Sequence, residues 1–272
     1  MPTFNGQIPP THRHSHGEPT LLSRLLELDS HIHERLLDEA LDAVASHIHH
    51  DRVRRIMDVG AGTGAATFRL SARYPQAEVI ALDANPAMTQ QVAARVAGEH
   101  IRPITRPVLA VGLEAGSIDL AWASSVAHEF DNPVESFKAL SEVIRPDGVL
   151  AIMEMDGPPR VLPTRYDGLE SRLRQLANAD TPGPEWATFL AAAGFELLEK
   201  NTLVSDQQLP ADGIGGDYAR AELHRLALHA AGSLNAEEKA SLSQILESST
   251  GTPSLPHVHI RGTRSLWIAR HL

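Results

Sequence analysis

The glycine-rich segment at residues 55–64 constrains the fold of this chain more than any other. Its sequence is RIMDVGAGTG, a short apolar strand that runs into a turn with alternating glycines, and a helical pattern opens at Ala65. Glycine tolerates positive φ and carries no Cβ, so such a turn lets a bound molecule approach the backbone closely. In open α/β sheets, ligands collect at the carboxyl ends of the strands. The segment therefore predicts an α/β fold with a ligand site at this turn.

Two interpretations of the turn follow from its spacing. Gly60, Gly62 and Ala65 satisfy the looser form of the dinucleotide-binding fingerprint, with Asp83 at about the expected distance downstream. The alternative places an acid, Asp58, inside the end of the strand, with glycines at every second position after it. Both interpretations put the ligand at the same turn, but they predict different ligands.

The second pattern, followed by the strand VIALD at residues 79–83 and then NPAM, resembles the class I S-adenosylmethionine-dependent methyltransferases. The resemblance runs from about Arg55 to Met155 and returns in the last strand. Several ordered motifs agree, so we prefer it to the dinucleotide interpretation. It implies a Rossmann-like doubly wound α/β sheet, mostly parallel with an antiparallel last strand, plus an N-terminal helical cover and helical insertions near the substrate cavity.

Composition limits the class of protein. The chain has 272 residues, 42% of them hydrophobic and 21% charged, which is ordinary for a globular protein with a sizeable core. Its 34 acidic and 24 basic residues give a net charge of −10, which argues against a general nucleic-acid-binding surface. Cys is absent, so disulfides and thiolate metal sites are excluded. No apolar run reaches membrane-spanning length and the N-terminus lacks a signal-peptide pattern, so we expect a cytoplasmic protein.

The chain is expected to divide into an N-terminal arm and helical cover over residues 1–50 and a methyltransferase-like core over 51–272. Insertions are expected at about 157–183 and 205–258. In the cover, apolar residues recur at helical spacing, and Asp29–Ser30 is expected to break it into two helices by capping the second.

The core reads as alternating strands and helices. Strands are predicted at residues 55–59 and 78–82, within 104–111, and at 117–123, 149–155, 195–204 and 264–269. Helices are predicted at residues 65–74, 86–97, 133–144, 167–177, 184–193 and 216–246. The alternation predicts parallel strands joined by crossover helices.

The resemblance also assigns cofactor-binding roles. Asp58 is expected to hold the ammonium of the methionine tail beside the amides of the turn, unless it only ties down the loop. Asp83, at the end of the second strand, is expected to accept from both ribose hydroxyls. Met88 offers the adenine a soft apolar surface, unless it only packs its helix. The expected set is Asp58, Gly60, Ala61, Gly62, Gly64, Asp83, Ala84, Met88 and Ser124.

One departure from the family pattern concerns adenine. Members often carry an acid after the third strand that accepts from the adenine amino group, but residues 101–113 contain no Asp or Glu. Arg102, Thr105 and Arg106 stand there instead. A backbone carbonyl is the acceptor that could replace the missing acid.

The segment after the fourth strand carries the catalytic candidates. By resemblance, this loop lies beside the sulfonium and the acceptor. Methyl transfer is an in-line displacement, in which alignment and exclusion of water can supply much of the catalysis. For a hydroxyl or protonated amine acceptor a base would help, and His128 titrates in the useful range, with Glu129 as the second candidate. The alternative for His128 is a packed or hydrogen-bonded loop histidine.

Two histidine-containing segments raise the question of a metal. The tract at residues 12–16 alternates His with other residues, and His257 and His259 alternate before the last strand. No carboxylate near the tract is placed to complete a site, so we interpret it as a polar loop. We interpret His257 and His259 as exposed side chains on a surface strand. We therefore predict no metal site.

The sequence predicts an enzyme that transfers a methyl group from S-adenosylmethionine to a small molecule at oxygen, nitrogen or carbon. No nucleic acid or membrane is expected as a partner, and a homodimer stays open. One alternative is a methyltransferase-fold binding or regulatory protein without turnover, which the missing adenine acid favours. The other is an NAD-dependent oxidoreductase, which would need a nicotinamide half and a proton donor that we do not recognise in the sequence.

Overall fold

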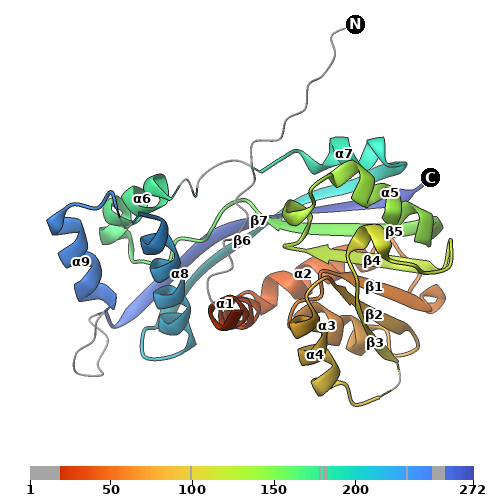
Figure 1. The fold of residues 1–272 in the computed structure, drawn as a ribbon, viewed down its shortest axis with the longest axis horizontal. Coiled ribbons are helices and arrows are strands. Elements are labelled where there is room, and N and C mark those ends of the chain that lie inside the picture. The colour runs from red at the N-terminus through yellow and green to blue at the C-terminus, as the bar shows by residue number, and fades with distance from the viewer. Residues whose placement is uncertain (1–18, 99, 178, 180–182, 231, 247–254) are drawn as a thin grey trace, which may run out of the picture.

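The computed structural model describes residues 19–98, 100–177, 179, 183–230, 232–246 and 255–272. Within these residues the chain forms a seven-stranded sheet with helices on both faces and a helical lobe at one end (Figure 1). The strands are β1 (Arg55–Val59), β2 (Glu78–Asp83), β3 (Ile101–Thr105), β4 (Ile118–Ser124), β5 (Ile144–Met155), β6 (Phe195–Pro210) and β7 (His257–His271). The helices are α1 (Pro19–Ile32), α2 (Glu34–Ala45), α3 (Ala65–Arg73), α4 (Pro86–Arg95), α5 (Pro133–Val143), α6 (Asp167–Leu176), α7 (Trp186–Ala192), α8 (Ile214–Ala230) and α9 (Ala236–Leu246).

The strand order is β3-β2-β1-β4-β5-β7-β6. The first five strands pair in parallel, and β7 runs antiparallel to both of its neighbours. This confirms the expected Rossmann-like sheet with an antiparallel last strand. It also differs from the dinucleotide-binding order, in which a sixth parallel strand closes that side of the sheet.

The prediction for the third strand was wrong in position. We expected a weak strand within 104–111, preceded by Pro103 and interrupted by Pro107, but β3 spans Ile101–Thr105. Pro103 fits inside this strand because β3 pairs only with β2 and forms an edge of the sheet. Proline is tolerated at an edge, where the missing N–H costs no ladder hydrogen bond.

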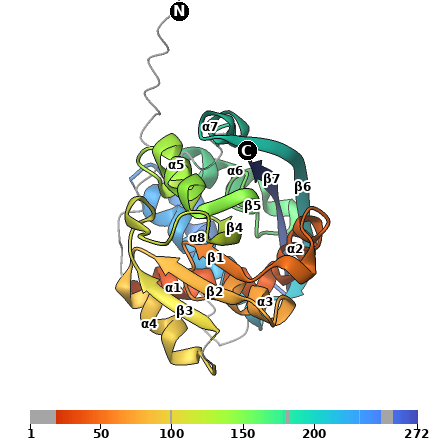
Figure 2. The same ribbon diagram turned by 90° about the vertical axis from the view of Figure 1, so that its right-hand side faces the viewer.

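Successive residues of the central strands face opposite sides of the sheet, and each side has its own core. Ile56 and Leu120 pack on one side beneath α2 and α3, whereas Met57 and Ala121 pack on the other beneath α5 and α7 (Figure 2). Because both faces are covered, β1 and β4 are buried along almost their whole length, as expected for parallel strands.

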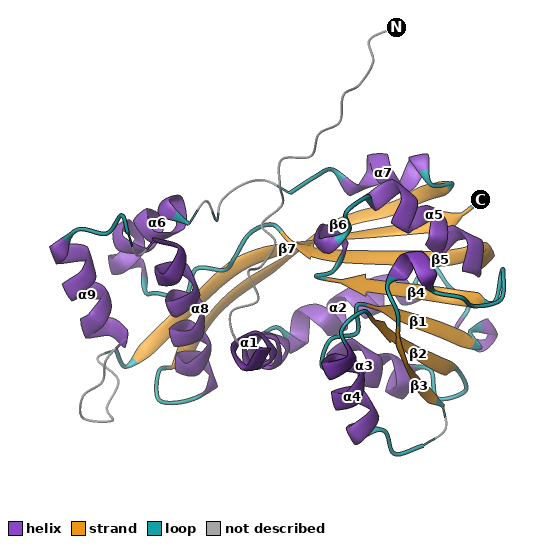
Figure 3. Cartoon of the chain, viewed as in Figure 1, coloured by secondary structure: helices purple, strands orange, loops and turns teal. Residues whose placement is uncertain are grey.

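The last two strands are much longer than predicted. They form an antiparallel ribbon that continues beyond the sheet to α6, α8 and α9 (Figure 3). A third apolar core forms there, where Leu223 and Leu226 of α8 pack with Val258 and Ile260 of β7. Residues 205–210 were expected to belong to an insertion, because this part of the chain is mostly polar. In the structure they pair with β7 and extend the strand β6.

The N-terminal cover breaks at His33 and not at Asp29. Asp29 lies inside α1, so the prediction that it caps the second helix was wrong. Helix α2 buries Leu37, Leu41 and Val44 against the core that also contains α3. Ion pairs between the exposed faces of α2 and α3 continue this contact. They join Arg69 to Glu34 and Asp38, and Arg73 to Asp42.

Candidate functional site

The turn after β1 has a backbone that suits glycine. Gly60, Gly62 and Gly64 have φ of 68°, 53° and 90°, values that other residues adopt only with strain. A Cβ on Gly60 would lie 2.3 Å from the Val126 side chain, which places the loop after β4 directly against the turn. A Cβ on Gly62 would meet no protein atom nearer than 4.0 Å. The turn is therefore tightly packed at Gly60, whereas a Cβ at Gly62 would be accommodated, with the Leu26 side chain of α1 at van der Waals distance.

The amides of this turn already have partners within the protein. Gly60 N and Ala61 N donate to the Leu82 carbonyl at 2.8 and 3.0 Å, and Gly62 N donates to Asp83 Oδ2 at 2.8 Å. We expected these amides to hold the cofactor's methionine tail. Within the protein they tie the turn to the end of β2, which fixes its shape, and their contact with a methionine tail stays a prediction.

Asp83 lies at the carboxyl end of β2, beside the turn as the sequence predicted. Its Oδ1 accepts from Asn85 N at 2.8 Å, and its Oδ2 accepts from Gly62 N. Each carboxylate oxygen has a second lone pair, so both oxygens can still accept from a bound hydroxyl. The two backbone hydrogen bonds orient the carboxylate in advance.

Asp58 is buried on the same side of the turn. The Thr67 hydroxyl of α3 donates to its Oδ2 at 2.5 Å. Burial raises the pKa of Asp58 to about 7, and the nearby negative charge of Asp83 acts in the same direction. An ammonium group beside Asp58 would favour its ionised form. The two acids thus flank one end of the turn, as the sequence predicted.

The predicted adenine side of the site is less defined. Met88 of α4 is only 5% exposed, so most of its surface packs within the protein. Thr105, which pairs with Asp83 in the sheet, shares a hydroxyl–hydroxyl hydrogen bond of 2.5 Å with Thr89. The contacts of Met88 and Ala84 with a bound adenine stay a prediction.

The loop after β4 begins with a strained residue. Ser124 ends β4, and Ser125 follows with φ of 52°, an uncommon value for a residue other than glycine. Ser125 N donates to the Met153 carbonyl of β5 at 2.8 Å, which holds this conformation. Backbone strain of this kind concentrates at functional sites, where the surrounding structure maintains it.

Glu154 organises this loop, and the sequence reasoning missed it. Its Oε1 accepts from Val126 N at 2.9 Å and Ala127 N at 2.7 Å, and its Oε2 lies 2.8 Å from His128 Nδ1. The sequence did mark Glu154 as unusual, because it is the one acid in the apolar run at residues 149–155. A charge in a buried strand requires partners.

His128 lies between two carboxylates. Its Nδ1 faces Glu154, and its Nε2 lies 3.3 Å from Glu129 Oε1. Burial alone would lower the pKa of His128, but the hydrogen bonds to Glu129 and Glu154 outweigh burial and raise the pKa to about 10. The ring is therefore an imidazolium at neutral pH, with no free lone pair to accept a proton. This geometry favours a role for its charge over the predicted role as a general base.

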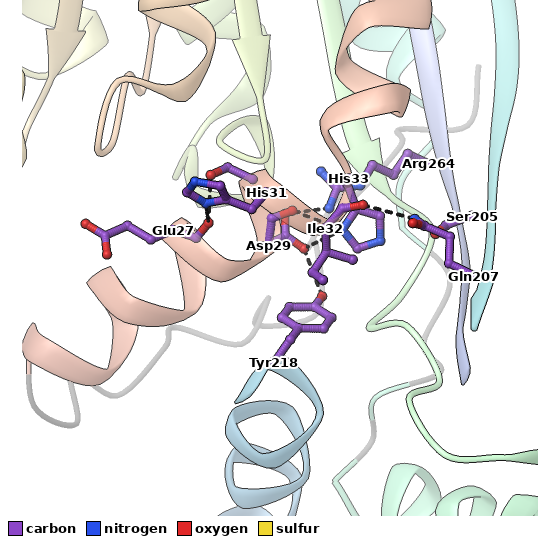
Figure 4. A network of polar contacts seen from close by, with 10 residues as sticks. Glu27, Asp29, His31, Ile32, His33, Ser205, Gln207, Tyr218 and Arg264 are labelled. Carbon is purple, nitrogen blue, oxygen red and sulfur yellow. Dashed lines mark hydrogen bonds and ion pairs between the residues drawn. The ribbon is translucent and has the colours of Figure 1, made fainter. Parts of the chain in front are cut away.

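A buried polar cluster joins the N-terminal cover to the lobe (Figure 4). Asp29 of α1 accepts from Tyr218 of α8 at 2.8 Å and from Arg264 of β7 at 2.6 Å, and His33 lies 3.2 Å from the same carboxylate. Burial would raise the pKa of Asp29, but Arg264 and His33 hold it well below its usual range. His33 and Arg264 also line a small cavity beside Met155, at the end of β5.

Only some of the histidines that we considered as metal ligands lie among the described residues. The tract at residues 12–16 lies outside the described residues. His259 Nε2 lies 2.6 Å from Asp206 Oδ1 on the β6–β7 ribbon, in agreement with a surface strand. Among the described residues, no group of three or more His, Asp or Glu side chains could hold a metal ion. The same residues include no helix that is long and apolar enough to cross a membrane.

Comparisons with known proteins agree with this geometry. Residues 57–152 match the family model of a methyltransferase domain. The malonyl-[acyl-carrier protein] O-methyltransferase of Dechloromonas aromatica is 36% identical over 108 residues, which are 38% of this chain and 37% of that protein. The trans-aconitate 2-methyltransferase of Azoarcus is 32% identical over 143 residues, which are 53% of this chain and 50% of that protein.

A solved structure supports the fold over most of the chain. BH2331 of Bacillus halodurans aligns with 86% of this chain and 97% of its own, with a TM-score of 0.55 and 17% sequence identity. The sheet order, the glycine turn and the matched domain together define a methyltransferase fold. Residues 57–152 thus carry a methyltransferase domain, and the fold of the chain is that of the class I S-adenosylmethionine-dependent methyltransferases. It spans half or less of the length of the two relatives described above.

Proposed function

We propose that this protein transfers a methyl group from S-adenosylmethionine to a small acceptor molecule. The observation that carries the proposal is the placement of Asp58 and Asp83 beside one glycine turn, in which Gly62 N donates to Asp83. The loop of His128 lies against the same turn through Val126. By their names, the two relatives act on malonyl-[acyl-carrier protein] and on trans-aconitate, and the second of these is a small molecule.

The residues at the turn fit the parts of S-adenosylmethionine. When bound, this cofactor supplies an electrophilic methyl carbon on a cationic sulfur. Asp58 would hold the ammonium, and its carboxyl group would ionise as it does so. Asp83 would accept from the ribose hydroxyls with an orientation already set by two backbone amides. The loop after β4, held by Glu154, would form the wall nearest the acceptor.

Much of the catalysis would come from alignment. A displacement at a methyl carbon needs the attacking atom, the carbon and the leaving sulfur in line, and positioning of this kind can supply a large part of the rate enhancement. The rigid turn, the strained loop and the buried Glu154 are features that hold such an alignment without reorganisation.

Calorimetry and labelled cofactor test the proposal. We expect the full chain to bind S-adenosylhomocysteine and not NAD, and to transfer label from S-adenosylmethionine to a member of an acceptor library. Binding of NAD alone would reverse the proposal. As a site control, Glu135→Gln removes an exposed charge that pairs with Lys138 on α5, so cofactor affinity should stay unchanged.

A second candidate is a binding or regulatory protein that has the fold and no turnover. The observation that favours it is the absence of Asp and Glu from residues 101–113, where family members often hold adenine. This candidate predicts binding of S-adenosylhomocysteine and no labelled product with any acceptor. A labelled product that disappears in Asp83→Ala would exclude it.

A further inference from the structure

The two acids beside His128 differ in how firmly they are held. The Glu154 side chain is 7% exposed, and it also accepts from two backbone amides. The Glu129 side chain is 46% exposed, and its Oε1 lies 3.3 Å from Nε2. Charge-assisted N–H···O contacts are normally about 2.7–2.9 Å long. Glu154 is therefore a fixed partner of the imidazolium, whereas Glu129 holds a long and solvent-exposed contact.

His128 lies close to the proposed cofactor site along the chain. Val126, two residues before His128, packs on the glycine turn at Gly60. Two residues span at most about 7 Å, so the backbone of His128 lies near the turn. A ligand that takes the place of the Glu129 carboxylate on Nε2 would therefore bind on the loop that contacts the turn.

We propose that the acceptor is a small carboxylic acid, methylated at a carboxylate oxygen, and that His128 binds this carboxylate through Nε2 in place of Glu129. The inference rests on the function proposed above and names its substrate class. Exchange of one carboxylate for another keeps the charge beside the imidazolium unchanged, so the incoming acid does not have to be neutralised by any new group.

The chemistry of a carboxylate matches a histidine that already carries its proton. One carboxylate oxygen accepts from Nε2, and the other forms the new C–O bond with the methyl carbon. The C–S bond breaks, and its electron pair stays on sulfur. A carboxylate anion and a sulfonium cation become a neutral ester and a neutral thioether, so no proton is transferred. His128 keeps its proton throughout.

Other acceptor classes fit this arrangement less well. A protonated amine would be repelled by the imidazolium and would need a base before it could attack. An alcohol would also have to lose its proton, and the high pKa of His128 means that this ring already carries one at neutral pH. A carboxylate needs no base, because it is ionised at neutral pH.

Equilibrium binding tests the inference separately from turnover. The full chain is saturated with S-adenosylhomocysteine and titrated by calorimetry with short aliphatic mono-, di- and tricarboxylic acids and with the amide and alcohol of each skeleton. We expect at least one acid to bind, and its amide and alcohol to bind about tenfold more weakly or not at all. Labelled methyl transfer to that acid should give a base-labile ester.

Three variants test which residues bind the carboxylic acid. His128→Gln keeps a hydrogen-bond donor and removes the charge, and we expect acid affinity to fall about tenfold or more, the scale of a charge-assisted hydrogen bond. Glu129→Gln removes the competing carboxylate, and we expect acid affinity to rise several-fold. Glu135→Gln is the matched control, since Glu135 is an exposed acid paired with Lys138 on α5. It should leave acid affinity unchanged.

The outcomes separate the two proposals. If S-adenosylhomocysteine does not bind, the proposed function fails and this inference fails with it. If it binds but no acid binds, or amides and alcohols bind as well as acids, the carboxylate inference is overturned and the proposed function stands. The inference is also overturned if His128→Gln retains full acid affinity, or if Glu129→Gln weakens acid binding as His128→Gln does.

Discussion

The two ends of this molecule are built from different kinds of sequence information. The cofactor side is local: the turn at residues 60–64, Asp58 and Asp83 lie within one β-α-β unit. The far side is not local, because the cluster around Asp29 gathers Tyr218 and Arg264 from the other end of the chain. Short-range spacing defines the first site, and long-range pairing of β6 with β7 defines the second.

This difference gives the two regions different expected weaknesses. On the proposed cofactor side, Asp83 is held by two backbone amides and Asp58 by the Thr67 hydroxyl, all within one unit, so a substitution should mainly change binding. In the cluster, each side chain comes from a different element, so a substitution should mainly change stability. The predictions below test that contrast.

The largest effect is expected for Asp29→Ala. The substitution leaves the buried Arg264 without its carboxylate partner, and removal of one partner from a buried ion pair costs about 3–5 kcal/mol. The free energy of unfolding from urea denaturation measures the loss. S-adenosylhomocysteine affinity of the folded fraction should stay near that of the parent. A loss of affinity without a loss of stability would contradict the contrast.

Asp83→Ala is expected to show the opposite pattern. We predict that it weakens binding of S-adenosylhomocysteine by about 1–3 kcal/mol, the scale of charge-assisted hydrogen bonds to the ribose. Calorimetry measures the affinity. Unchanged affinity would remove Asp83 from the cofactor site.

Cofactor affinity should depend on pH through Asp58. Its pKa in the folded protein is raised from 3.8 to about 7, so below pH 7 the carboxyl group must lose a proton before it can pair with an ammonium. Affinity for S-adenosylhomocysteine should therefore rise with pH, by about tenfold per unit below 7, and level off above it. The stability of the unliganded protein should change in the other direction. Because the folded pKa is above the unfolded value, this contribution is fully present below pH 3.8 and is lost as pH rises through about 7.

A matched variant isolates that group. Asp58→Asn cannot titrate, so both pH dependences should flatten between pH 6 and 8. Calorimetry at several pH values gives the affinities, and thermal denaturation gives the stabilities. If the parent protein binds with the same affinity at pH 6 and pH 8, Asp58 does not pair with the ligand's ammonium.

The smallest effect is expected for Asp38→Ala, on the exposed face between α2 and α3. Surface ion pairs contribute about 0.2–1 kcal/mol, because solvent screens them and the side chains lose entropy. Urea denaturation at low and high salt measures the difference, which should shrink as salt rises. A loss as large as that of Asp29→Ala would show that the α2–α3 contact depends on this pair.

The sequence predicted the parallel half of the fold well because its signals are local. The strand β1 was predicted at its observed bounds, and α3 and α4 follow turns marked by Gly64 and by Asn85–Pro86. Those signals depend on residues a few positions apart, so one sequence is enough to read them.

The far half was harder because its elements depend on distant partners. The outer part of β6 is polar and becomes a strand only by pairing with β7. The range 216–246 was predicted as one helical segment, but α8 and α9 are separate helices. In the site, His128 was predicted as a base. Its charge depends on Glu154, which lies on another strand, so His128 alone did not indicate its protonation state.

The β6–β7 ribbon is shared by the sheet and the lobe, and this sharing has a consequence for how the protein can diversify. At one end, β7 pairs with β5 and β6 pairs with β7, so the two strands complete the edge of the sheet. At the other end, the same two strands pack against α6, α8 and α9. Substitutions on the exposed surfaces of those helices change the lobe while the ribbon keeps its hydrogen-bonded register. The lobe can then change without moving the glycine turn.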